Sequence, residues 1–176
     1  HLIFIDEFPT FNRDAKLFNF NSTLIDSEKY FNELNYFFKI VETYYGFKIK
    51  ICCSNKHHYN ENPYNNREII YGKTLENIGI SSLVIGHDSD SLFQSIYSKS
   101  PTILLISDSQ INIKKQKIKN FSNLIGVNYI NLINKKELFD FHLKIKRPDN
   151  KNLLSEFFLN VDGSNKSHVN TVIENL

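Results

Sequence analysis

Short apolar runs alternate along the chain with segments in which apolar residues recur at every third or fourth position. An apolar run of four to six residues is typical of a buried strand, and the longer spacing is typical of a helix that lays one face on a sheet. The strand-like runs lie at residues 2–6, 48–54, 69–71, 82–86, 102–107 and 127–132. Strands that alternate with helices form a parallel sheet through crossover connections. The pattern predicts an α/β fold: a Rossmann-like parallel sheet with helices on both faces.

The clearest helix follows Asp26 or Ser27, either of which can cap it, and Gly46 supplies its stop. Before it, residues 7–25 are polar and aromatic and are expected to form a loop. Further helices are expected at residues 73–78, 90–98, 111–124 and 135–146. We therefore expect a Rossmann-like domain over residues 1–134 and a helical C-terminal extension over residues 135–176 that packs on the same domain.

The composition is that of one ordinary domain, with 176 residues, 41% hydrophobic residues and a formal charge of +2. So small a net charge gives no strong field for nucleic acid, which we do not expect as a partner. The adjacent Cys52 and Cys53 would point to opposite faces of a strand, so we expect both to be buried free thiols in a reducing compartment. No apolar run approaches the roughly 20 residues of a membrane span. We expect a cytoplasmic protein, and the start at His1 suggests a segment of a longer one.

Ligands of open parallel sheets bind at the carboxyl ends of the strands, and the turn at residues 87–91 (HDSDS) lies at such an end. Small hydroxyl residues at a strand-to-helix turn offer hydrogen-bond donors to an anion, so Ser89 and Ser91 could hold a phosphate. The alternative is that Asp88, Ser89 or Asp90 simply caps the next helix.

Asp88 and Asp90 oppose a phosphate, because two carboxylates at one turn repel an anion. They could instead bind Mg²⁺ or Mn²⁺ through their oxygens, although a three-residue DXD pattern is weak support for a metal site. No resident cofactor is expected.

Other polar groups have both a functional and a simpler interpretation. His57 and His58 could contact a phosphate or a metal, with Lys56 and Arg67 adding positive charge, but exposed loop histidines are the simpler interpretation. Glu7 and Asp14 could act as acid or base, although loops carry acidic residues more often for solubility. The basic helix is most simply a solvated face, and its lysines are Lys114, Lys115, Lys117 and Lys119. The chain has no G-x-G-x-x-G, P-loop, nucleophile elbow or H-E-x-x-H motif.

The order of segments resembles a known family. The stretch from Ile3-Phe4-Ile5-Asp6 through KIKICCSNKHHY, REIIYGKTLENI and SSLVIGHDSDSLFQSIYSKSPTILLIS is similar to the nucleotide-sugar-binding half of GT-B glycosyltransferases of bacterial capsule and surface-carbohydrate biosynthesis, and more distantly to sialyltransferases and polysialyltransferases. The resemblance covers residues 2–132 and implies a single GT-B half.

The resemblance also implies a set of substrate-binding residues. In the family a strand-end His-Pro motif faces the nucleotide, and a later Ser-x-Ser motif holds its phosphate. The positions that correspond here are Ser54, Lys56, His57, Thr74, His87, Ser89 and Ser91. The His-Pro position falls on Ser54-Asn55, and Asp90 replaces a small hydroxyl residue, so the chain departs from the pattern at both motifs.

The resemblance implies the donor-binding domain of a glycosyltransferase of bacterial surface polysaccharide biosynthesis, with a CMP- or UDP-linked sugar as substrate. The general base of such enzymes usually comes from an N-terminal domain, so the resemblance assigns no catalytic residue to this chain and implies a missing N-terminal GT-B domain as partner. Peripheral association with membrane-bound polysaccharide machinery would be consistent with it. The alternative is a non-catalytic, degenerate Rossmann-like module that mediates protein assembly.

Overall fold

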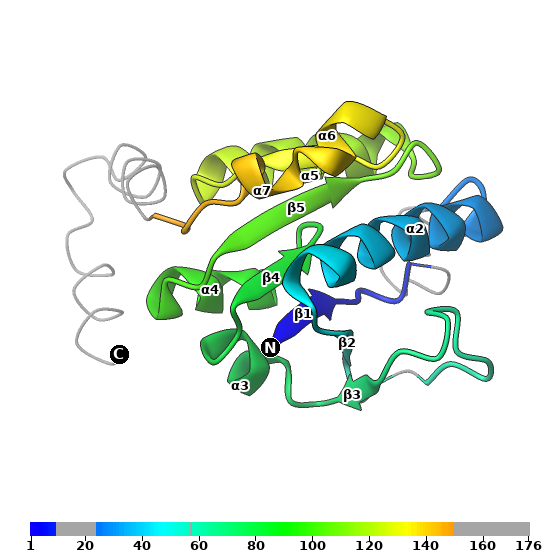
Figure 1. The fold of residues 1–176 in the computed structure, drawn as a ribbon, viewed down its shortest axis with the longest axis horizontal. Coiled ribbons are helices and arrows are strands. Elements are labelled where there is room, and N and C mark those ends of the chain that lie inside the picture. Colours follow the sequence, from blue (N-terminus) through cyan, green and yellow to red (C-terminus); the bar gives the residue numbers. More distant parts are fainter. Residues whose placement is uncertain (10–23, 57, 150–176) are drawn as a thin grey trace, which may run out of the picture.

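The computed structural model describes residues 1–9, 24–56 and 58–149 (Figure 1). The strands are β1 (Leu2–Ile5), β2 (Ile49–Cys53), β3 (Ile69–Tyr71), β4 (Leu83–Gly86), β5 (Thr102–Ile106) and β6 (Tyr129–Asn131). The helices are α2 (Ser27–Tyr45), α3 (Thr74–Gly79), the 3-10 turn η2 (Asp90–Leu92), α4 (Phe93–Ser98), α5 (Asn112–Leu124), α6 (Lys135–Phe139) and α7 (Phe141–Lys144). Much of the loop expected at residues 7–25 lies outside the described residues.

The six strands of the described residues form one sheet in the order β3-β2-β1-β4-β5-β6, and every neighbouring pair is parallel. This is the doubly wound order in which the chain moves outward from β1 to β3 and then crosses to β4. The α/β Rossmann-like fold predicted from the sequence is therefore confirmed.

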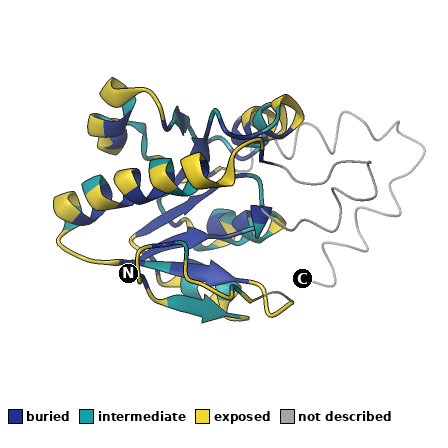
Figure 2. Ribbon diagram, turned by 90° about the vertical axis from the view of Figure 1, so that its right-hand side faces the viewer, coloured by how far each residue is buried: buried dark blue, intermediate teal, exposed yellow. Residues whose placement is uncertain are grey.

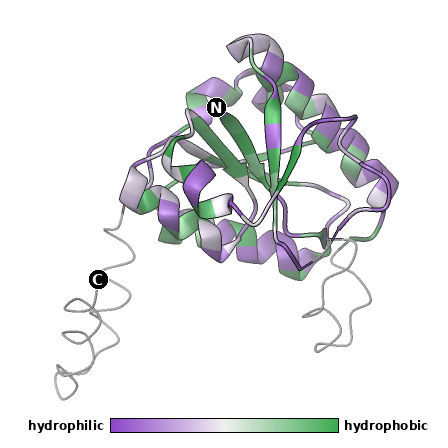
Figure 3. Ribbon diagram, turned by 90° about the horizontal axis from the view of Figure 1, so that it is seen from below, coloured by the Kyte–Doolittle hydropathy of each residue, from purple (hydrophilic) through white to green (hydrophobic). Residues whose placement is uncertain are grey.

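The alternation of side chains along each strand divides the core into two layers. Leu2 and Phe4 of β1 face the layer beneath α2, α6 and α7, whereas Ile3 and Ile5 face the layer beneath α3, α4 and α5. Each strand is apolar on both sides because helices cover both faces. Buried strands run through the middle of the molecule (Figure 2), and the hydrophilic residues lie mostly on the helices around them (Figure 3).

Helix α2 begins and ends where the sequence predicts. The Asp26 carboxylate accepts a hydrogen bond from the backbone amide of Lys29 at 2.9 Å, which caps the first turn. Gly46 ends the helix in the left-handed conformation, at a φ of 73°. Between these ends, Tyr30, Leu34 and other apolar residues at helical spacing are fully buried against the sheet.

Two expected helices are shorter than predicted. Residues 90–98 form the turn η2 and then the six-residue α4, and the helix expected at 135–146 breaks at Asp140 into α6 and α7. Leu138 and Phe141 anchor these last two helices in the layer beneath α2. Residues 150–176 of the predicted extension lie outside the described residues, so the division into two segments stays a prediction. Within the described ranges, no helix is long and apolar enough to cross a membrane.

Candidate functional site

A cavity of about 180 Å³ opens at the carboxyl edge of the sheet, where β1 and β4 are neighbours. The connection that follows β1 and the connection that follows β4 run toward opposite sides of the sheet. A doubly wound sheet is expected to bind its ligand between two such strands. The lining residues follow four different strands: Ile5, Asp6, Glu7, Phe8, Cys53, Ser54, Thr74, Ser89 and Ser91. The structure thus brings together four of the hydroxyl residues proposed from the sequence, namely Ser54, Thr74, Ser89 and Ser91.

The turn after β4 separates its serines from its aspartates. Ser89 and Ser91 line the cavity, whereas Asp88 and Asp90 line a different hollow of about 590 Å³ between this turn and α5. The carboxylates therefore lie on the other side of the turn from the serine hydroxyls. This arrangement weakens the objection that two aspartates at one turn would repel a phosphate held by the serines.

Three hydroxyls of the cavity are available to a ligand. Within the described parts of the chain, the side-chain hydroxyls of Thr74, Ser89 and Ser91 have no hydrogen-bond partner. Ser89 stands at the N-cap position of η2 but makes no side-chain capping bond there. The capping alternative therefore receives no support at Ser89, and a partly buried hydroxyl without a partner is free to bind a polar ligand.

The cavity continues into a shallower hollow of about 450 Å³, which shares Ser54, Thr74 and Ser91 with it and adds Lys56 and Lys73. Both lysines are exposed, so positive charge lies at the outer end of the combined site.

Gly72 allows the two loops of this outer hollow to meet. Its φ is +73°, and a Cβ at this position would overlap the side-chain amide of Asn55. Its amide donates to the carbonyl of Cys53 at 2.9 Å, which holds the turn after β3 against the end of β2. The positive φ therefore favours glycine here, and a larger residue would also have to displace the exposed Asn55 side chain.

His87, which the resemblance implies as a substrate-binding residue, does not line the cavity. Its ring is buried beneath α2, where Nδ1 lies 2.7 Å from the carbonyl of Leu105 and Nε2 lies 2.7 Å from the hydroxyl of Tyr30. Because a carbonyl only accepts, Nδ1 carries the proton and Nε2 accepts from Tyr30. Burial, with the positive charge of Lys114, lowers the pKa of His87 to about 4. In this geometry His87 is a neutral structural residue.

The sequence predicts that Lys114 lies on a solvated face, but in the structure it does not. It is buried, and its ammonium group forms ion pairs with the carboxylates of Glu7 and Asp88. The Glu7 carboxylate also accepts from the amide of Asp88 at 3.1 Å. Burial alone would lower the pKa of Lys114, but the two carboxylates outweigh it and raise that pKa. This cluster ties the loop after β1 to the turn after β4 and to α5.

Asp6 forms the inner wall of the cavity and was not singled out as a site residue from the sequence. Its carboxylate accepts from the Tyr59 hydroxyl at 2.7 Å, from the Cys53 thiol at 3.3 Å and from the Phe8 amide at 3.0 Å. Burial raises the pKa of Asp6 against these hydrogen bonds. The same burial and the nearby Asp6 charge raise the pKa of the Cys53 thiol, so Cys53 is not an activated nucleophile.

The remaining candidates are spread over the structure. His58 is exposed and its ring packs on Tyr71, while His57 and Asp14 lie outside the described residues. Cys52 and Cys53 are buried free thiols, as expected. Among the described residues, no three His, Cys, Asp or Glu side chains are grouped as metal ligands. A metal site at Asp88 and Asp90 would have to displace Lys114 from Asp88.

Comparison of the chain with protein-family models, curated proteins and solved structures finds no match.

Proposed function

We propose that the chain is the donor-binding half of a GT-B-type glycosyltransferase of bacterial surface polysaccharide biosynthesis, and that it holds a CMP- or UDP-linked sugar at the cavity between β1 and β4. One observation carries this proposal: Thr74, Ser89 and Ser91 all line one cavity at the switch point of the sheet. Their hydroxyls lack hydrogen-bond partners among the described residues. Ser54 joins them, with its hydroxyl accepting from the Lys56 amide at 3.2 Å.

The lining also holds the carboxylates of Asp6 and Glu7, of which Glu7 is paired with Lys114, so it is the hydroxyl groups that support a phosphate ester as ligand. Hydroxyl groups donate hydrogen bonds to phosphate oxygens, and Lys56 and Lys73 at the outer end supply positive charge without a fixed ion-pair partner among the described residues. The domain's contribution to transfer would be to position the donor and to stabilise the departing phosphate. A general base for the acceptor hydroxyl would come from a separate GT-B domain.

The test is a calorimetric titration of the chain with CMP, CDP, UDP, GDP and ADP, with and without Mg²⁺. We expect one pyrimidine nucleotide to bind selectively and the Ser89→Ala/Ser91→Ala variant to bind it about a hundredfold more weakly, because each hydrogen bond to a charged group contributes about 1.5–3 kcal/mol. Ser82→Ala is the matched control, since Ser82 is an exposed serine just before β4, at the opposite edge of the sheet. Unchanged binding by the double variant would disprove the phosphate site.

A second function is a non-catalytic module for protein assembly, and the Glu7–Lys114–Asp88 cluster favours it. The buried cation nearest to the cavity is already neutralised by two carboxylates, and so it adds no net positive charge for a phosphate. Failure of every nucleotide to bind to the folded chain, together with stable self-association in light scattering, would favour this alternative.

A further inference from the structure

A surface away from the cavity combines exposed aromatic and aliphatic side chains with lysines. It lies on the C-terminal half of α2, the residues just after it, and α6–α7, on the side of the molecule that faces the viewer in Figure 1. We call it the aromatic–lysine surface, and its members are Tyr36, Lys39, Tyr44, Phe47, Lys135, Lys136, Phe139, Leu143, Lys144 and Lys146.

Several apolar members of this surface are largely open to solvent. Leu143 is 72% exposed and Phe47 is 69% exposed, and neither sits at a position that the fold needs for its core. Tyr44 joins the two elements, because its ring stacks on His142 at 5.3 Å and meets the buried Phe141 at 5.4 Å. Scattered exposed apolar residues are ordinary, but large ones gathered on neighbouring elements point to an interaction site.

The lysines of the surface carry uncompensated charge. Among the described residues, none of the five forms an ion pair; exposed lysines elsewhere, such as Lys56 and Lys117, are also unpaired, so what distinguishes the five is that they surround apolar side chains. The acidic residue of the C-terminal half of α2, Glu42, is buried and bound to Arg67. Glu137 on α6 and Asp140 between α6 and α7 bring two negative charges against the five lysines. The surface therefore has a net positive charge around its apolar centre.

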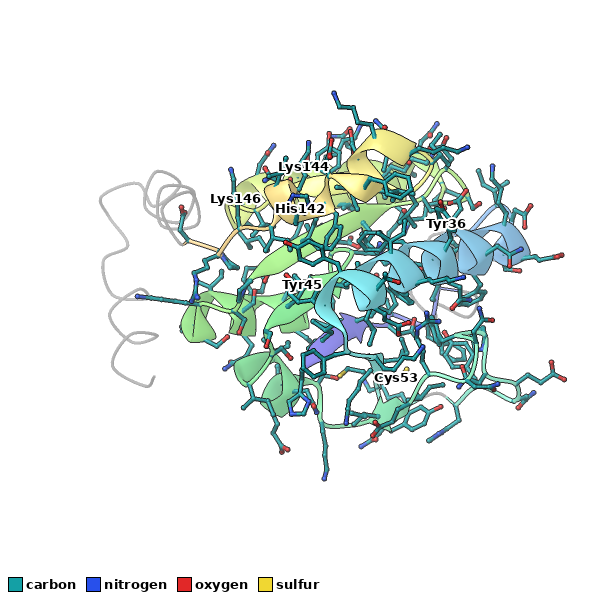
Figure 4. All side chains as sticks on the ribbon, in the orientation of Figure 1. Tyr36, Tyr45, Cys53, His142, Lys144 and Lys146 are labelled. Carbon is teal, nitrogen blue, oxygen red and sulfur yellow. The ribbon has the colours of Figure 1, made fainter. Side chains whose placement is uncertain are left out.

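In Figure 4, Tyr36 lies on α2, and His142, Lys144 and Lys146 lie on or beside α7. Aromatic rings that sit at the headgroup level, surrounded by lysines, are the chemistry by which a protein lies on an anionic bilayer. Each Lys or Arg near such a surface contributes about 1 kcal/mol, which falls off with added salt. We propose that the aromatic–lysine surface docks this chain on a membrane that contains anionic lipids.

The experiment is co-sedimentation of the full chain with vesicles of phosphatidylcholine alone and of phosphatidylcholine mixed with phosphatidylglycerol. We expect binding to the mixed vesicles only, and we expect it to weaken as salt is added. The loss of each lysine should weaken binding about fivefold. The variant Lys135→Glu/Lys136→Glu/Lys146→Glu, which loses three, should therefore bind at least about a hundredfold more weakly. The variant Phe139→Ser/Leu143→Ser should also bind more weakly, because it removes apolar area from the bilayer.

The control variant is Lys117→Glu/Lys119→Glu, which makes the same change on exposed lysines of α5, on the other face of the sheet. It should bind the mixed vesicles as the unaltered chain does, and thermal unfolding should show that all three variants are folded. Equal binding to both kinds of vesicle, equal losses in the α5 control, or dimer formation through this surface in place of vesicle binding would overturn the proposal. None of these outcomes depends on whether a nucleotide binds at the cavity.

Discussion

Period-two alternation continues past the ends of β1 and β4 and decides which of the next residues turn toward the layer beneath α2. Leu83 and Ile85 point toward α2, and His87 follows them on the same side, so its ring enters the core. Asp6 continues the series of Leu2 and Phe4 in the same way. Both placements could have been predicted from the alternation alone, had it been extended into the loops.

Ser89 and Ser91 could be proposed from the sequence because small hydroxyl residues at a strand end are suited to an anion. The side of the turn on which they lie could not be predicted, since it depends on the backbone of η2. Lys114 shows the opposite case: its spacing to Ile118 places it on the buried stripe of α5, but a charged residue on such a stripe needs partners from other loops. Those partners, Glu7 and Asp88, are distant in sequence.

The neutral, buried His87 predicts a specific dependence of stability on pH. Its pKa is about 4 in the folded chain and about 6.5 when unfolded, so the unfolded state binds the proton more readily between these values. The stability that comes from keeping His87 neutral is therefore fully present above about pH 6.5. It is lost as pH falls towards 4, and the free energy of unfolding then decreases by about 3 kcal/mol.

Urea unfolding at a series of pH values measures this contribution when the unaltered chain is compared with His87→Gln. The difference in slope between the two proteins, rather than their absolute stability, reports the titration of the imidazole. Parallel stability curves from pH 7 to pH 4 would show that His87 is not held neutral in the fold.

The elements of the fold differ in how far their sequences determine them. The ends of α2 follow from Asp26 and Gly46, which are local signals read within one turn. The break between α6 and α7 carries no such signal, because residues 135–146 contain neither glycine nor proline and the break is set by packing of Leu138 and Phe141 on the core. Tertiary contacts therefore decide the short elements, and local signals decide the long one.

Arg67 fixes the long loop between β2 and β3 on α2. Its guanidinium group donates to both carboxylate oxygens of Glu42, at 2.8 and 3.0 Å, and to the Asn35 side chain at 2.7 Å. All three residues are buried. From the sequence, Arg67 was interpreted as a source of charge for a ligand, and the pairing was missed because its partner lies 25 residues away.

Arg67→Lys should destabilise the chain by about 1–3 kcal/mol, because an ammonium group keeps the charge but cannot reproduce the two-pronged contact and leaves buried acceptors unpaired. Chemical denaturation at neutral pH gives the value. Lys50→Ala is the control, since it removes the more exposed pair with Glu68 and should cost only about 0–1 kcal/mol. Equal losses in the two variants would contradict the role assigned to Arg67.

The sheet as a whole was predicted more securely than its site. Alternating strands and helices imply a parallel sheet, and a parallel sheet implies a ligand position at the carboxyl edge. The order of the strands places the switch point between β1 and β4, and this order brings Ser54, Thr74, Ser89 and Ser91 to one cavity. The sequence pattern does not contain that order, so which of the strand-end loops would meet could not be predicted from it.

The most direct test of the central claim is to follow the backbone amide resonances of the ¹⁵N-labelled chain during titration with the nucleotide that binds best. We expect the amides of Ser54, Thr74, Ser89 and Ser91 to shift together and to saturate with one affinity, while amides of α6 and α7 stay in place. Shifts confined to another part of the molecule, or no shifts with any of the five nucleotides, would contradict the assignment of the β1–β4 cavity as the nucleotide site.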